Sequence, residues 1–212
     1  MFNYPDKTKV NKQFTLKELF KLLNCDKDLK LNASSIESIC LSNVLSKNTT
    51  NLNESENVKE IYIIDIFLKE NIVPNKFIDR FNKNINFQTL FRIHCKENTK
   101  YIMSIKTFTD DKANILLTFE SDWQKVVEKK FSSTLKLVNV FKEMLKCVSG
   151  YEIKDDESFD GYVQRFNQIK KLKSEIVKLT KQVNAEKQPN LKMELNDRLK
   201  QMKKQLQELE GR

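Results

Sequence analysis

The last quarter of the sequence holds two stretches of regularly spaced apolar residues, one on each side of Pro189. In both stretches the apolar residues recur at alternating intervals of three and four, which is the spacing of a coiled-coil seam. Each stripe is too apolar to be left in water. The first seam is Ile169, Leu172, Ile176, Leu179 and Val183, and the second is Leu195, Leu199, Met202, Leu206 and Leu209.

Pro189 constrains how the two stretches are connected. Proline inside a helix costs about 3 kcal/mol or more, whereas in the first turn of a helix it is tolerated. The sequence therefore predicts a turn over residues 184–190, with Pro189 opening a second helix and the two seams packed together as an antiparallel hairpin. One kinked helix packed on its own domain is the alternative.

The charge of the chain is concentrated in the same region. Residues 1–160 carry 25 Lys and Arg against 23 Asp and Glu, whereas residues 161–212 carry 13 against 6. The first part is therefore nearly neutral, and the last part has a net charge of +7. We expect an α+β body over residues 1–150, an acidic linker over 151–161 and a basic coiled-coil hairpin over 162–212.

The body is predicted to be a mainly antiparallel sheet with flanking helices. Thr15 and Glu18 form a capping-box pattern for a helix to about Cys25. Residues 36–44 fit a strand or a helix, and we favour a strand. The continuously apolar residues 58–69 predict the central strand. A short helix should follow Pro74.

A meander and one more helix are predicted in the rest of the body. The stretches FQTLFRIHCK, KYIMSIKTF and ILLTFESDW have strand character, and ENT and DDKAN are turn signals between them. A helix should then run from about Thr134 to Val148. Its predicted apolar face is Leu135, Val138, Phe141, Leu145 and Val148.

Several classes of site are excluded or made improbable by composition. Glycine occurs only at positions 150, 161 and 211, so the chain cannot build the glycine-rich phosphate loops of Walker, Rossmann or kinase sites. Cys25, Cys40, Cys95 and Cys147 are far apart, which favours reduced thiols over disulfides or structural zinc. We expect no metal and no cofactor.

The location of the protein is also predicted from the sequence. No stretch approaches the roughly 20 apolar residues that are needed to cross a bilayer, and the first residues lack the apolar run of a signal peptide. We therefore expect a soluble, cytoplasmic protein with no membrane partner.

Asp65 and His94 are the candidate chemical residues of the body. Asp65 interrupts the apolar run IYIIDIFL, where a carboxylate needs a partner or marks a site. A metal-dependent nuclease that uses Asp65 with Glu60 and Lys96 is one alternative, although HCK has His94 where such a site needs a carboxylate. His94 and Cys95 point to opposite faces of a strand, so they cannot form a nucleophile and base pair. We interpret His94 as an ordinary strand residue.

Lysines are distributed around both arms of the predicted hairpin, mostly off the seam. Such residues usually form a solvated surface, and they are candidates for contact with an acidic partner or with DNA phosphates. Direct nonspecific DNA binding is therefore a second alternative. The residues are Lys170, Lys171, Lys178, Lys181, Lys200, Lys203 and Lys204.

Several long stretches together resemble an uncharacterised bacterial family, the domain of unknown function four-three-nine-one. They are MFNYPDKTKVNK, VKEIYIIDIFLKE, NINFQTLFRIHCKENTKYIMSIKTF, ESDW and EKQPNLKMELNDRLKQMKKQL. The resemblance implies a gene context of DNA methyltransferases and helicases in restriction-like and antiphage defence clusters, and it supplies no catalytic residues. We therefore expect a noncatalytic accessory subunit that docks through its hairpin onto a larger helicase, nuclease or methyltransferase.

Overall fold

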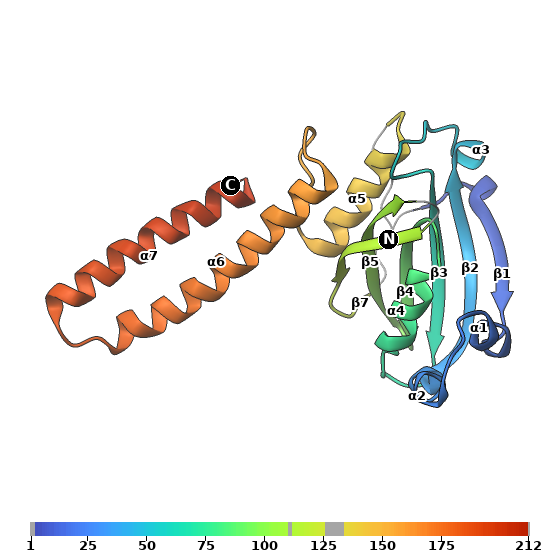
Figure 1. The fold of residues 1–212 in the computed structure, drawn as a ribbon, viewed down its shortest axis with the longest axis horizontal. Coiled ribbons are helices and arrows are strands. Elements are labelled where there is room, and N and C mark those ends of the chain that lie inside the picture. Colours follow the sequence, from blue (N-terminus) through green and yellow to red (C-terminus); the bar gives the residue numbers. More distant parts are fainter. Residues whose placement is uncertain (1–2, 110–111, 126–133, 212) are drawn as a thin grey trace. The chain divides into compact units, whose positions relative to one another are not determined.

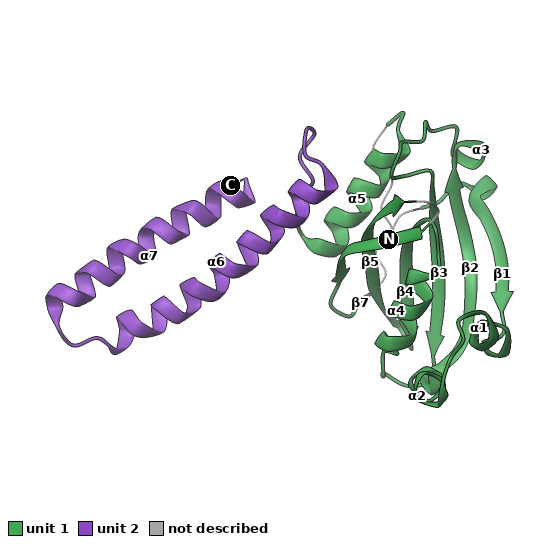
Figure 2. Cartoon of the chain, viewed as in Figure 1, with its two compact units in different colours: residues 1–152 green, residues 153–212 purple. Residues whose placement is uncertain are grey.

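The structure is a computed structural model that describes residues 3–109, 112–125 and 134–211. It divides into two compact units, Met1–Glu152 and Ile153–Arg212 (Figure 2). The first unit combines a sheet with short helices, and the second is a pair of long helices (Figure 1). The chain therefore has the predicted α+β class with a C-terminal helical hairpin.

The first unit is built on one mixed sheet. Its strands follow the order β1-β2-β3-β4-β5-β6, and β7 pairs with β5. The pair β3 and β4 is parallel, and the other described pairs are antiparallel. The strands are β1 (Lys9–Phe14), β2 (Ile36–Ser46), β3 (Glu60–Leu68), β4 (Gln88–Cys95), β5 (Asn98–Thr109), β6 (Lys112–Glu120) and β7 (Gln124–Lys125).

Short helices connect and cover the strands. The predicted capping box is present, because Thr15 and Glu18 exchange side-chain and backbone hydrogen bonds at the start of α1. The helices are α1 (Leu16–Leu22), α2 (Lys27–Asn32), α3 (Lys47–Thr50), α4 (Asn75–Lys83) and α5 (Leu137–Ser149), with 3-10 turns at η1 (Asp6–Thr8) and η2 (Ala33–Ser35).

Most predicted strands of the body are confirmed. Residues 36–44 belong to β2, and β3 lies inside the sheet as expected for the apolar run 58–69. The strands β4, β5 and β6 form the predicted antiparallel meander. The first two residues of the predicted DDKAN turn, 110 and 111, lie outside the described residues.

The crossover helix α4 covers one face of the sheet. Parallel strands need a long connection, and here α4 carries the chain from β3 to β4 after Pro74. Phe77 and Phe81 of α4 pack with Ile64 of β3 and Phe91 of β4 in one buried cluster. Leu19 of α1 and Leu29 of α2 belong to the same cluster, so these helices share that face.

Lys106 of β5 is buried beneath the end of this crossover, with no exposed surface. Its Nζ donates hydrogen bonds to the carbonyl oxygens of Asn82 (2.9 Å), Ile85 (3.0 Å) and Phe87 (2.9 Å), which use its three N–H groups, and Oγ1 of Thr89 lies 3.3 Å away. Burial lowers the pKa of Lys106 to about 7. The side chain therefore satisfies carbonyl groups in the last turn of α4 and just after it, and fixes the connection to β4.

Helix α5 differs from its predicted position. It lies against β5 and β6 and begins at Leu137, three residues later than predicted. Leu135 is 79% exposed, so its assignment to the apolar face of the helix was wrong. Leu135 precedes the helix, whereas Phe141 and Leu145 of the predicted face are buried, together with Leu137, Val140 and Met144.

The second unit confirms the role predicted for Pro189. Helix α6 (Phe159–Ala185) and helix α7 (Pro189–Glu210) pack together, and Pro189 occupies the first turn of α7. The side chain of Ser158 caps α6 by accepting a hydrogen bond from the Gly161 amide at 3.1 Å. Helix α6 thus begins within the segment that was predicted to be a linker. Within the described residues, no helix is both long enough and apolar enough to span a bilayer.

Candidate functional site

The seam of the hairpin is closed by its own two helices. Leu179 and Val183 of α6 form a buried cluster with Leu199 and Met202 of α7. The neighbouring seam residues Leu172, Ile176 and Leu195 are partly buried against this cluster. Ile169 is also buried, and Leu206 is half-buried. The seam residues therefore hold the hairpin together, so a partner would contact other side chains of the two helices.

Arg165 ties together the open end of the hairpin. Its Nε and Nη2 donate to the carboxylate of Glu157 at 2.6 and 2.7 Å, and its Nη1 donates to the Leu209 carbonyl oxygen at 3.1 Å. Burial alone raises the pKa of Glu157, but the bonds from Arg165 outweigh burial and lower it below its usual value. Position 165 continues the seam by one heptad before Leu172, so an arginine replaces an apolar residue where α7 ends.

One flank of the hairpin carries more positive than negative charge. An ion pair of 2.8 Å between Lys173 Nζ and Glu210 Oε1 joins α6 to α7 and marks the flank that these residues share. Lys170 is three residues from Lys173, and Lys203 is seven residues from Glu210, so both lie on that flank. Lys200 is three residues before Lys203 and Lys192 is eleven residues before it, so both lie on the same side of α7. We call Lys170, Lys173, Lys192, Lys200 and Lys203 the basic flank; Lys173 pairs with Glu210, and Lys200 Nζ lies 3.5 Å from Oδ1 of Asp197.

The opposite flank has balanced charge. Helical spacing places Lys171 and Lys178 of α6 on that side with Glu175. On α7 the same side carries Arg198 with two carboxylates, Glu194 and Glu208. We call these six residues the mixed flank. The predicted contact lysines are all exposed, with Lys181 and Lys204 on the outer surfaces of their helices between the flanks.

Two exposed apolar side chains lie on the basic flank. Val177 is seven residues after Lys170, and Met193 is seven residues before Lys200, so both share the side of those lysines. Their exposed fractions are 56% for Val177 and 69% for Met193. They are single exposed apolar side chains on two different helices, which are ordinary at a protein surface, so the lysines are what distinguish this flank.

Asp65 is the centre of a polar network on the sheet. Its carboxylate accepts two hydrogen bonds from Arg92, one from Ser42 Oγ and one from His94 Nε2 at 2.7 Å. The other ring nitrogen of His94 lies 3.0 Å from Thr99 Oγ1. Burial alone raises the pKa of Asp65, but these hydrogen bonds and the charge of Arg92 hold it below its usual value. A carboxylate offers about four lone-pair positions, and here all four are used.

Aromatic residues surround this network. Phe67 stacks on the ring of His94 with 4.7 Å between the ring centroids, and Arg92 lies 5.9 Å from the centroid of the Tyr4 ring. Burial raises the pKa of Tyr101, whose hydroxyl has no hydrogen-bond partner among the described atoms. The network is therefore a packed cluster around an ionised carboxylate whose charge is balanced by Arg92.

The residues of the nuclease alternative are not brought together. Glu60 begins β3, five positions before Asp65, so the alternation of the strand directs the two side chains to opposite faces. Lys96 lies beyond the end of β4, in the turn to β5. Across residues 3–109, 112–125 and 134–211, no three His, Cys, Asp or Glu residues are grouped as metal ligands.

Sequence reasoning missed the partners of Asp65. Arg92 is its direct neighbour in the parallel pairing of β3 with β4, and this register is not visible in either strand alone. Ser42 of β2 also donates to Asp65, and the β2 register shifts between Leu41 and Asn43, which the sequence of β2 alone does not reveal.

The fold and the hairpin define a two-unit protein in which a mixed α+β sheet unit is followed by a self-paired helical arm. The chain belongs to the family described as "Domain of unknown function (DUF4391)", whose sequence model matches residues 2–206. No curated protein matches the chain, and no solved structure matches it.

Proposed function

We propose that this protein is a noncatalytic accessory subunit of a bacterial antiphage, restriction-like defence assembly in the cytoplasm. Its hairpin docks onto a larger protein of that assembly, a helicase, nuclease or methyltransferase. The observation that carries this proposal is the basic flank, where Val177 and Met193 stand exposed among five lysines.

The chemistry of this flank fits an acidic protein surface. Covering Val177 and Met193 removes apolar area from water, which a phosphate backbone cannot do as well as a protein surface. The lysines around them then face carboxylates of the partner, which steers association and fixes its orientation. The mixed flank, with its balanced charges, offers no comparable attraction.

The state of the sheet supports an accessory role. Asp65 is fully engaged by Arg92, Ser42 and His94, so it has no lone pair left for a metal ion or an attacking water. Both nitrogens of His94 are also engaged. Thr99, the partner of Nδ1, is only 1% exposed, so this pair of side chains is closed to a substrate.

Coexpression with the product of an adjacent gene tests the proposal. The full chain should copurify with that product, and deletion of residues 161–212 should abolish the complex. Circular dichroism and thermal melting of the shortened chain check that the sheet unit is still folded. A complex that survives the deletion contradicts docking through the hairpin.

Direct DNA binding is the second candidate function, and the excess of lysines on the basic flank favours it. Each phosphate contact releases counterions, so retention of duplex DNA by the isolated protein would fall steeply with salt. Tight, salt-sensitive retention that persists without any partner protein would favour this alternative over docking.

A further inference from the structure

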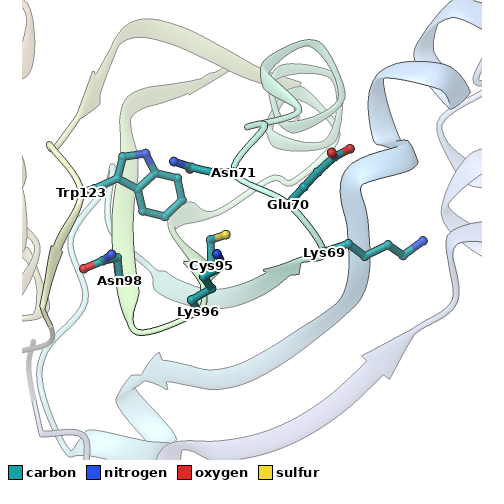
Figure 3. Close-up of a pocket in the computed structure, with 7 residues that line it drawn as sticks. All are labelled: Lys69, Glu70, Asn71, Cys95, Lys96, Asn98 and Trp123. Atoms are coloured by element: carbon teal, nitrogen blue, oxygen red, sulfur yellow. The ribbon is translucent and has the colours of Figure 1, made fainter.

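A hollow of about 460 Å³ opens at the end of the sheet where the parallel strands β3 and β4 terminate. Lys69, Glu70 and Asn71 line it directly after β3, and Lys96 and Asn98 line it around the turn after β4. Trp123 forms another part of its wall (Figure 3). Its volume is within the range of small-molecule sites, and the carboxyl ends of adjacent parallel strands are a recurrent place for them.

The fold holds the lining of this pocket in place. Strand β7 begins one residue after Trp123 and pairs with β5, where Gln124 lies opposite Thr99 and Lys125 opposite Asn98. The indole is partly buried against the sheet core, so its orientation is restrained. Lys96 adopts a left-handed backbone conformation with φ of 54°, which turns the chain sharply between β4 and β5.

The lining combines three recognition chemistries. The indole of Trp123 offers a flat aromatic surface for stacking. The amides of Asn71 and Asn98 each provide donors and acceptors for the polar edge of a planar ring. Lys96 supplies an ammonium group that suits an anion, whereas the Lys69 side chain points away from Trp123 (Figure 3) and its Nζ lies 3.5 Å from the Ser34 carbonyl oxygen.

We propose that this pocket binds a nucleotide, with the base stacked on Trp123 and the phosphate at the ammonium group of Lys96. The amides of Asn71 and Asn98 would then meet the edge of the base. This site lies within the sheet unit, and it is independent of the proposed docking by the hairpin.

Trp123 makes the test direct, because it is the one tryptophan in the sequence. Titration of the full chain with adenosine monophosphate, followed by fluorescence excited at the red edge of the indole band, should give saturable quenching. Adenosine has the base without the phosphate, and ribose 5-phosphate has the phosphate without the base. Both should bind more weakly than the complete nucleotide, and ribose 5-phosphate should not quench.

Two matched lysine variants distinguish binding in the pocket from nonspecific attraction of an anion to the positive charge of the protein. Lys96→Gln should weaken nucleotide binding by about tenfold or more, as expected for the loss of a charge-assisted hydrogen bond. Lys112→Gln removes the same charge at the opposite end of the β5–β6 hairpin and should leave binding unchanged. Asn71→Ala, in the exposed loop after β3, gives a second test that does not disturb the core.

The source of the nucleotide is decided by comparing ligands. Quenching by adenosine monophosphate indicates a free nucleotide, whereas quenching by a short single-stranded oligonucleotide alone indicates a nucleic-acid strand or its end. Either result supports the pocket if Lys96→Gln weakens it. The proposal is overturned if no nucleotide or oligonucleotide quenches Trp123, or if Lys96→Gln and Lys112→Gln have equal effects.

Discussion

Asp65 on β3 and His94 on β4 are joined by a hydrogen bond of 2.7 Å between Oδ1 and Nε2, across the parallel strand pair of the sheet. Arg92, two residues before His94, binds the same carboxylate from the strand position directly opposite Asp65. One buried acidic side chain therefore binds two partly buried basic side chains.

Removal of this carboxylate should destabilise the sheet unit strongly. Asp65→Ala leaves the partly buried Arg92 without its counterion, and loss of one partner from a largely buried pair costs up to about 3–5 kcal/mol of unfolding free energy. Urea denaturation measures the loss. Asp122→Ala, which removes an exposed carboxylate, should change the unfolding free energy by less than about 0.5 kcal/mol. Equal effects of the two substitutions would contradict the account of the network.

A further variant at the same position, Asp65→Asn, tests the nuclease alternative. Asp65→Asn keeps the shape of the side chain and removes its charge. We expect no metal-dependent DNA cleavage by the wild type above the background of a mock purification. If the wild type cleaves DNA and Asp65→Asn does not, the result would support the alternative that the protein is a nuclease centred on Asp65.

Acid should weaken the fold through Asp65. Its pKa is below the usual value in the folded state, so the unfolded chain binds more protons as the pH falls below about 4. The contribution of the carboxylate is therefore complete above that pH and is lost as the pH falls through the folded-state pKa. The difference in unfolding free energy between wild type and Asp65→Asn should shrink across this window, as measured by urea denaturation at a series of pH values.

Lys106 should contribute to stability through its carbonyl partners. Lys106→Met keeps the aliphatic stem but leaves the carbonyl oxygens of Asn82, Ile85 and Phe87 without this donor. Buried unsatisfied groups cost about 1–3 kcal/mol each, so the midpoint of urea unfolding should fall clearly. Lys112→Met at the exposed start of β6 is the matched control and should have little effect.

The pH dependence of the Lys106 effect has a defined sign. The folded-state pKa of about 7 lies below the ordinary value for lysine, about 10.4, so the unfolded chain binds more protons between these pH values. The free energy of unfolding of the wild type, relative to Lys106→Met, should therefore rise from about pH 7 to about pH 10. A difference that stays flat or falls would show that the pKa is not lowered.

The hairpin seam should respond to truncation of a single leucine. Leu199 is 7% exposed within the cluster of Leu179, Val183 and Met202, so Leu199→Ala should cost about 2–4 kcal/mol of local stability. Hydrogen exchange should show faster exchange in α6 and α7. Val177→Ala removes an exposed side chain and should leave exchange in both helices nearly unchanged. If the two variants exchange alike, the helices are not held by this seam.

The parts of the fold that could be predicted are those with a local signal. The spacing of Leu179, Val183, Leu199 and Met202, together with the position of Pro189, was enough to predict the hairpin. The start of α1 at the Thr15 capping box and the strand β3 in the apolar run were also predicted correctly, because each has a local sequence signal. Strand β1 was missed because its residues Lys9–Phe14 are mostly polar and exposed at the sheet edge, so they show no apolar alternation.

The parts that could not be predicted depend on contacts distant in sequence. Asp65 and His94 were each named as candidate residues from the sequence, but their hydrogen bond depends on the parallel register of β3 and β4, which the sequence does not show. Lys106 looks like an ordinary surface residue in the sequence, and only the return of the chain after α4 surrounds it with carbonyl groups. Trp123 likewise becomes part of a pocket only through the pairing of β7 with β5.

The most direct test of the docking account is to reverse charge on one flank of the hairpin at a time. Lys170→Glu with Lys203→Glu alters the basic flank, and Lys171→Glu with Lys178→Glu makes the same change in charge on the mixed flank. Calorimetric titration of each full-length variant with the coexpressed neighbour measures the dissociation constant. The account predicts that binding weakens at least about a hundredfold for the basic flank and changes less than about threefold for the mixed flank. Equal losses on the two flanks, or wild-type binding by the basic-flank variant, would contradict it.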